Sequence, residues 1–210
     1  MNHIHRKRKG KYGEMALMLD MSKAYNWVEW ECLQLIMHKL GFHERWIQLV
    51  MRFVLPITYV IRVNGVPCGA IRPTRGLRQG DPLSPYFFIL VAEGLSALIH
   101  KAIQTRTLKW LAASVRGSKV SHLFFVDDSL IFNCPTIKER WEIQRILQVY
   151  EASLGQQLNW SKTSLFFSWN LDNATKESIK TMFGAQLIKP HESYLGLLSL
   201  VGRSKKNSFT

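Results

Sequence analysis

The sequence predicts an α+β fold in which an antiparallel sheet packs against helices on one side. Apolar, strand-like segments intermix with amphipathic helical segments along the chain, and Asn64-Gly65 between two strand-like segments is a strong hairpin signal. Hairpins join antiparallel neighbours, which is why the sheet is expected to be antiparallel. The chain has 210 residues, 47% of them hydrophobic and 20% charged, so it can build one sizeable core.

The first half of the chain is expected to hold a buried strand, three helices and a hairpin. Residues 15–19 are apolar and end at Asp20, which predicts a buried strand with a carboxylate at its carboxyl end. Helical spacing of apolar residues follows in three places. The expected helices are residues 29–40, which end before Gly41, residues 43–54, which end before Pro56, and residues 84–102, which have Ser84 as N-cap and Pro85 in the first turn. The expected hairpin strands are residues 57–63 and 70–72.

The second half is expected to begin with a hairpin around Asp127-Asp128, because large apolar residues flank this pair on both sides. Thr136 and Glu139 have the spacing of a capping box, which predicts a helix running towards Leu154 with Gly155 as its stop. Residues 158–168 are strand-like, 172–183 are helical, and 194–201 form a further strand or hairpin.

Charge and composition restrict the partners. The formal net charge is +13, from 28 Lys and Arg against 15 Asp and Glu, which favours a polyanion such as nucleic acid. The strongest apolar stretch, 87–99, is too short to span a membrane and contains Glu93, so no membrane is expected. Three widely spaced cysteines indicate a reducing compartment, and no secretory signal is evident. We expect an intracellular protein; the basic residues 3–11 are compatible with a nuclear address, a phosphate contact or a solvated arm.

Asp127 and Asp128 are two adjacent carboxylates inside an apolar run. Neighbouring anions repel each other, and partial burial raises the free-energy cost of keeping both carboxylates charged unless a cation neutralises them. Hard oxygen ligands suit Mg²⁺, although a solvated turn also explains an Asp-Asp pair taken alone. With Asp20 at another strand end, three carboxylates are the minimum for two divalent ions, an arrangement used for in-line phosphoryl transfer.

Five segments, in order, resemble the motifs of reverse transcriptases from non-LTR (LINE-type) retrotransposons, particularly the plant elements. Similarity runs from about Arg8 to Lys206. The segments are 19–25 (LDMSKAY), 75–85 (RGLRQGDPLSP), 121–129 (SHLFFVDDS), 155–163 (GQQLNWSKT) and 194–197 (YLGL).

The resemblance implies a right-hand polymerase palm with incomplete fingers and thumb, and RNA-directed DNA polymerase activity. The implied cofactors are two Mg²⁺ ions, with Mn²⁺ as a substitute. The implied partners are an RNA template, a DNA primer and deoxynucleoside triphosphates. We expect a basic arm over 1–14, the partial reverse transcriptase domain over 15–203 and a tail over 204–210, with no prediction of oligomeric state.

The same resemblance assigns roles to individual residues. Asp20, Asp127 and Asp128 would hold the metal ions, and Tyr25 would be the aromatic gate against a ribose 2′-hydroxyl, with ordinary core packing as its alternative. Lys162 would protonate the departing pyrophosphate, or serve only solubility at a strand edge.

A loop after the predicted hairpin would contact the incoming nucleotide or template. Gln79 and Gly80 would form this contact, in a loop where Gly76 and Gly80 let the backbone approach closely. Arg75 and Arg78 would contact phosphates. The alternatives are a purely structural glycine-rich turn and solvated basic side chains.

The chain departs from the family pattern at Asn26-Trp27, where Asp-Arg is usual, and at Val126, where alanine is usual. An Asp-Arg ion pair would be lost, Trp27 would need an apolar contact, and Val126 adds bulk beside the carboxylates. Because little chain precedes Asp20 or follows Tyr194, we expect the isolated chain to be weak or inactive as a polymerase. The alternative function is a non-catalytic nucleic-acid-binding remnant of a retrotransposon.

Overall fold

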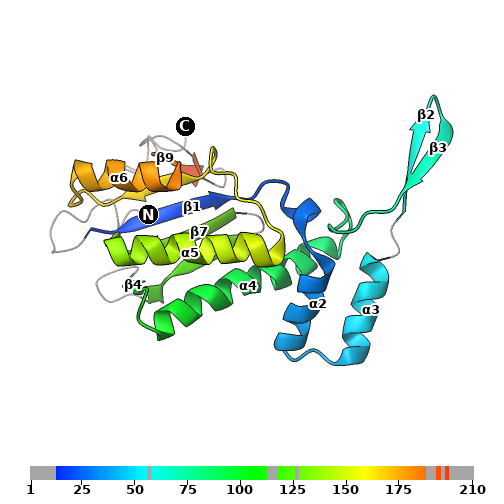
Figure 1. The fold of residues 1–210 in the computed structure, drawn as a ribbon, viewed down its shortest axis with the longest axis horizontal. Helices are drawn as coiled ribbons and strands as arrows, with labels where there is room; N and C mark the ends of the chain where they lie inside the picture. The colour runs from blue at the N-terminus through cyan, green and yellow to red at the C-terminus, as the bar shows by residue number, and fades with distance from the viewer. Residues whose placement is uncertain are drawn as a thin grey trace. The chain divides into compact units, whose positions relative to one another are not determined.

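The computed structural model describes residues 13–55, 58–112, 118–125, 128–187, 193–194 and 197–198. It has the expected mixture of strands and helices (Figure 1). Its internal contacts divide the chain into two compact units. The sheet unit comprises Met1–Asp20, Ile99–Ile146 and Leu158–Thr210, and the helical unit comprises Met21–Leu98 and Leu147–Gln157.

A five-stranded sheet with the strand order β6-β7-β1-β8-β9 forms the centre of the sheet unit. The prediction of an antiparallel sheet is confirmed for the first four strands and is wrong for the last, because β9 pairs with β8 in parallel. The strands are β1 (Met15–Asp20), β6 (His122–Phe125), β7 (Asp128–Asn133), β8 (Ser164–Phe167) and β9 (Gln186–Leu187).

Strand β1 has a strand on either side, and its first five residues are all buried. A strand buried on both faces has a continuous apolar sequence, which is why this segment could be recognised. The strand predicted over 158–168 is shorter in the structure, because Lys162 and Thr163 donate their backbone N–H groups to the Asn159 carbonyl in a turn before β8.

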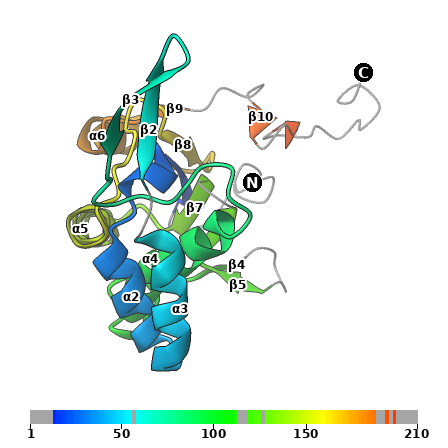
Figure 2. The same cartoon turned by 90° about the vertical axis from the view of Figure 1, so that its right-hand side faces the viewer.

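Helices α5 (Ile137–Leu154) and α6 (Asn173–Phe183) follow the sheet strands in the sequence. The first part of α5 and all of α6 lie on the same face of the sheet (Figures 1 and 2). They bury Ile143, Ile146, Ile179 and Phe183. The one-sided cover that the sequence predicted is therefore present for these two helices.

The predicted capping box at the start of α5 is half formed, and α6 has a side-chain cap that was not predicted. The Glu139 N–H donates to Thr136 Oγ1 at 3.3 Å as in a capping box, but the Glu139 carboxylate accepts from the N–H of Cys134, two residues before Thr136, at 3.2 Å. Asp172 Oδ1 accepts from the Thr175 N–H at 2.7 Å and caps α6.

Two short ribbons complete the strands of the sheet unit. Strands β4 (Leu111–Ala112) and β5 (Lys119–Val120) pair with each other, as do β10 (Ser193–Tyr194) and β11 (Leu197–Leu198). The second ribbon lies where the sequence predicted a strand or hairpin over 194–201.

The helical unit begins with a short 3-10 helix and continues with two helices and a hairpin. Helix α2 buries Trp30, Leu33 and Met37, and α3 buries Ile47, Val50, Met51 and Val54. The elements are η1 (Ala24–Trp27), α2 (Trp30–Lys39), α3 (Glu44–Val54), β2 (Tyr59–Val63) and β3 (Val66–Ile71).

The β2–β3 hairpin turns at Asn64-Gly65 as predicted, with both residues at positive φ (50° and 82°). All residues from Thr58 to Arg72 are exposed. The hairpin therefore gains little from burial, and its turn and ladder hydrogen bonds hold it together.

Helix α4 (Ser84–Gln104) is longer than the apolar stretch on which the sequence argument relied. By length and composition alone it could cross a membrane, so the expectation that this segment is too short is wrong. A third of its most apolar window is buried within the protein. The buried side chains recur at helical spacing, which is how a core helix packs; they are Phe87, Phe88, Val91, Leu95, Ile99 and Ala102.

Candidate active site

Strands β1 and β7 bring two of the three predicted carboxylates together. Their antiparallel register pairs Asp20 directly with Asp128, although 107 residues separate Asp20 from Asp127 in the sequence. Directly opposed residues of an antiparallel pair have Cα atoms about 4.5–5.5 Å apart and side chains on the same face of the sheet. Both Asp residues are half-buried at the end of a buried strand pair.

The third carboxylate, Asp127, comes between β6 and β7 in the sequence. Phe125 at the end of β6 pairs with Asp128 at the start of β7. Asp127 and Val126 lie outside the described residues, and the predicted role of Asp127 and the predicted effect of Val126 stay predictions. Within the part of the chain that is described, no three His, Cys, Asp or Glu residues form a group able to hold a metal ion.

The donor set fits a hard divalent cation. Like charges placed directly opposite each other on neighbouring strands are destabilising. Asp20 and Asp128 occupy such a pair, and carboxylate oxygens are the ligands that Mg²⁺ and Mn²⁺ take from proteins. A bound cation would turn this repulsion into attraction.

Lys162 lies in a turn that is attached to Asp20 through the backbone. The Asn159 N–H donates to the Asp20 carbonyl at 2.8 Å, and the Lys162 N–H donates to the Asn159 carbonyl at 3.0 Å. The Lys162 side chain is exposed. This turn keeps the lysine in the same unit as Asp20 and Asp128, as its predicted role requires.

Tyr25 lies in η1 of the helical unit, five residues after Asp20. Its ring is half-buried and stacks on Phe88 of α4, with centroids 5.3 Å apart. An aromatic stack of this kind holds the ring in place and leaves one part of it accessible. The geometry is compatible both with the predicted gate and with ordinary packing.

The predicted nucleotide-binding loop is fastened to η1 and the start of α2. The Leu77 N–H donates to the Tyr25 carbonyl at 2.7 Å, and the Gly76 N–H donates to the Val28 carbonyl at 2.8 Å. In return, Trp30 Nε1 donates to the Gly76 carbonyl at 2.7 Å. These bonds fix the loop backbone immediately before Arg78 and Gln79.

The two loop glycines differ in what they require. A Cβ atom at Gly76 would lie 2.9 Å from the Asn26 carbonyl oxygen, and φ is +94°, so this position needs glycine for both space and conformation. Gly80 also has positive φ (+85°), but a Cβ there would meet open space. The expected close backbone approach is thus present at Gly76, while Gly80 is required for its backbone conformation.

The loop side chains divide into engaged and free groups. Arg75 forms an ion pair with Glu29 at 3.1 Å, and its guanidinium lies 4.1 Å from the centre of the Trp27 ring. Arg78 and Gln79 are exposed. Trp27 therefore has a cationic contact, where the sequence analysis had expected an apolar one.

Gln156 is a buried residue that sequence reasoning did not single out. Its side chain is fully buried, and Nε2 donates to the carbonyl of Ala24, next to Tyr25, at 3.3 Å. Among the residues that the structure describes, none donates a hydrogen bond to its Oε1 atom. Its place in the motif at 155–163 was the available signal, but only the structure shows what the side chain supports.

His122 lies on β6, the strand that comes before Asp127 and Asp128 in the sequence. Its ring contacts the rings of His100 and Phe124, and the centroids of the His122 and Phe124 rings are 4.7 Å apart. The His100 ring in turn contacts Trp110. Burial and the nearby His100 lower the pKa of His122 from 6.5 to about 4. His122 is therefore neutral at physiological pH.

Comparisons with known proteins agree with this architecture. The family model described as reverse transcriptase (RNA-dependent DNA polymerase) matches residues 2–197. The chain is similar to an uncharacterized mitochondrial protein of Arabidopsis thaliana, with 37% identity over 52% of this chain and 88% of the relative. It is also similar to the 149 kDa protein of transposon TX1 from Xenopus laevis, with 24% identity over 70% of this chain. A third relative, the Pol polyprotein of the type-1 retrotransposable element R2 from Popillia japonica, has 26% identity over 61% of this chain.

The match spans only 11% of the transposon TX1 protein and 17% of the R2 polyprotein. Among solved structures, telomerase from Candida albicans, in complex with a TWJ fragment of telomeric RNA, superposes with a TM-score of 0.57 at 16% identity, over 88% of this chain and 29% of that one. Apo telomerase from Candida tropicalis gives the same TM-score and identity over 77% of this chain and 32% of that one. These two likenesses show a polymerase palm fold.

The palm sheet, the paired Asp20 and Asp128 and the ordered motifs agree with the family match over nearly the whole chain. This protein therefore belongs to the reverse transcriptases, and its relatives place it with those of non-LTR retrotransposons.

Proposed function

We propose that the chain is the palm-containing part of an RNA-directed DNA polymerase that transfers deoxynucleotides to a DNA primer on an RNA template. The observation that carries this proposal is the direct pairing of Asp20 with Asp128 at adjacent strand ends. Two opposed carboxylates need a cation, and a divalent cation near a primer end is what nucleotidyl transfer requires.

Asp20, Asp127 and Asp128 would hold two Mg²⁺ ions, for which Mn²⁺ can substitute. Ions in such a site lower the pKa of the attacking hydroxyl and stabilise charge on the transferred phosphoryl group and the leaving oxygens. Tyr25 restricts the sugar, and Gln79, Gly80, Arg75 and Arg78 orient nucleotide, template and phosphates. Lys162 supplies a proton to the departing pyrophosphate.

Primer extension tests the proposal directly. A DNA primer annealed to an RNA template is incubated with the chain, deoxynucleotides and either Mg²⁺ or Mn²⁺, beside Asp127→Asn and Asp128→Asn. We expect weak extension by the isolated chain, and none by either variant. Equal signals from all three proteins would overturn the enzymatic function.

The net charge of +13 supports a second function, a nucleic-acid-binding remnant without catalysis. Such a protein would bind RNA in a strongly salt-dependent way, and Asp128→Asn would not weaken that binding. RNA binding without any Asp128-dependent extension, in either metal, would select this alternative.

A further inference from the structure

Helix α3 has a second apolar stripe that its own unit leaves uncovered. Its first stripe is buried in the helical unit. The second consists of Trp46, Leu49 and Phe53, which are 53%, 42% and 59% exposed and follow one another at helical spacing. Three large exposed apolar side chains in one row on a helix indicate a binding surface.

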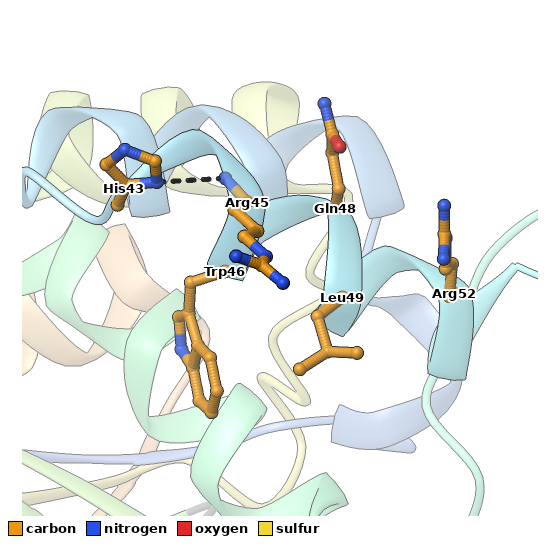
Figure 3. A pocket seen from close by; sticks show the side chains of 6 residues that line it. All are labelled: His43, Arg45, Trp46, Gln48, Leu49 and Arg52. Atoms are coloured by element: carbon orange, nitrogen blue, oxygen red, sulfur yellow. Dashed lines mark hydrogen bonds between the residues drawn. The ribbon is translucent and has the colours of Figure 1, made fainter.

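Basic and amide side chains border this stripe. Arg45, Gln48 and Arg52 are exposed on the same helix, and together with His43, Trp46 and Leu49 they line a hollow of about 670 Å³. Figure 3 shows Trp46 and Leu49 extending from the helix on one side, with the Arg45 guanidinium between them. The hollow thus combines an aromatic ring with two cations.

The charge of this surface is positive without compensation. Neither Arg45 nor Arg52 has an ion-pair partner among the described residues. The one acidic residue of α3, Glu44, accepts a hydrogen bond from Gln48 Nε2 at 3.1 Å and lies 3.6 Å from His38 Nε2. An anionic partner would therefore meet free guanidinium groups and little repulsion.

We propose that this surface, made of Arg45, Trp46, Gln48, Leu49 and Arg52, binds single-stranded nucleic acid through residues that the candidate metal site does not include. Exposed aromatics that stack on bases, beside cations that contact the backbone, are the usual means of binding single strands without sequence preference. Arg45 and Arg52 are seven residues apart, about 10 Å along the helix, so they can contact different phosphates of one strand. The proposal does not depend on polymerase activity.

The test is fluorescence anisotropy of a labelled single-stranded RNA with the full chain in EDTA, using Trp46→Ala and the double variant Arg45→Gln/Arg52→Gln. Stacking predicts roughly tenfold weaker binding for Trp46→Ala and a much smaller loss for Trp46→Phe. Loss of two phosphate contacts predicts a salt dependence that is shallower by about 1.4 in log Kd against log salt. A single-stranded DNA of the same sequence shows which of the two polynucleotides the surface prefers.

Matched controls come from α5. Trp141 is 63% exposed and has Lys138 and Arg145 one helical turn away on either side, but Arg145 is paired with Glu142 at 2.7 Å, so this face has one free cation beside its aromatic ring where α3 has two. Trp141→Ala and Lys138→Gln/Arg145→Gln should change RNA binding less than twofold.

Equal losses from the α3 and α5 variants would mean that binding follows overall charge, and would overturn the proposal. Unchanged binding in all the α3 variants would also overturn it, and would point to a protein partner for the stripe. Trp46, Arg45 and Arg52 are exposed, so none of these substitutions should unfold the chain, and circular dichroism checks this.

Discussion

Neutralising one of the paired carboxylates should stabilise the protein when no metal is present. Asp128→Asn keeps the shape of the side chain and removes one of two negative charges placed opposite each other on β1 and β7. Two unit charges about 5 Å apart repel by about 1 kcal/mol in a water-like dielectric and by about 3 kcal/mol at an effective dielectric of 20. Since both groups are half-buried, the expected gain is about 1 kcal/mol.

With a divalent metal bound, the natural chain should be more stable than Asp128→Asn. For a chain of this length, a gain of about 1 kcal/mol raises Tm by roughly 2–4 °C. A metal ion at one hundred times its Kd stabilises the folded state by about 2.7 kcal/mol, so Mn²⁺ should raise the Tm of the natural chain by more than the substitution does. The variant, with a ligand removed, should respond weakly.

Thermal denaturation in EDTA and in millimolar Mn²⁺ or Mg²⁺ measures both effects. Glu31→Gln is the control, because Glu31 is an exposed carboxylate on a helix, α2, and so has no carboxylate opposite it on a neighbouring strand. It should change neither the Tm in EDTA nor the response to metal. The reasoning fails if Asp128→Asn is less stable than the natural chain in EDTA, or if Mn²⁺ stabilises both proteins equally.

Three further predictions concern stability. Because the pKa of His122 is about 4 when folded and 6.5 when unfolded, the unfolded chain binds more protons between these values, so stability should fall as pH drops from 6.5 to 4. The full pKa difference corresponds to about 3 kcal/mol of stability, which solvent screening reduces to roughly 1–2 kcal/mol. His122→Phe should flatten this part of the pH profile of stability measured by urea denaturation. An unchanged profile would contradict the low pKa assigned to His122. Leu17→Ala removes a fully buried side chain from β1 and should cost about 3 kcal/mol by urea denaturation, whereas the exposed Leu35→Ala should cost under about 1 kcal/mol. Gly76→Ala should cost about 2 kcal/mol or more, because its Cβ would press on the Asn26 carbonyl at positive φ, while Gly80→Ala should show the smaller conformational cost alone; equal losses would refute the steric argument.

Much of the fold could be predicted because local signals agreed with the tertiary structure. The apolar run ending at Asp20 is a strand, Asn64-Gly65 is a turn, and Thr136 caps a helix, each where the sequence predicted it. In each case the deciding interaction is within a few residues of the signal. Short-range chemistry is visible in a sequence.

The features that escaped prediction depend on long-range pairing. Strand β9 joins the sheet in parallel over only two residues, too short for a periodic pattern. The turn at Asn159 shortened the strand predicted over 158–168, since backbone bonds to Asn159 and Asp20 outweighed its strand-like composition. The proximity of Asp20 to the Asp127-Asp128 pair was predicted from strand ends and motif resemblance, but the direct pairing of Asp20 with Asp128 depends on a strand register that spacing could not give.

The departure at Asn26-Trp27 shows how one contact can replace another. Trp27 stands where a basic residue is usual in the family, and the structure gives its ring a guanidinium from Arg75, which also pairs with Glu29. A cation–π contact and an exposed ion pair are worth about 0.5–1 kcal/mol each, so together they can tie the Arg75 loop to η1 without the lost Asp-Arg pair. Arg75 is then held by the protein through Nη1, and a phosphate that contacts its other guanidinium donors would share the side chain with Glu29. If Trp27 and Arg75 act together in this way, Trp27→Ala and Arg75→Gln should destabilise the chain non-additively in a double-mutant cycle, whereas Trp27→Ala with the distant Arg145→Gln should be additive.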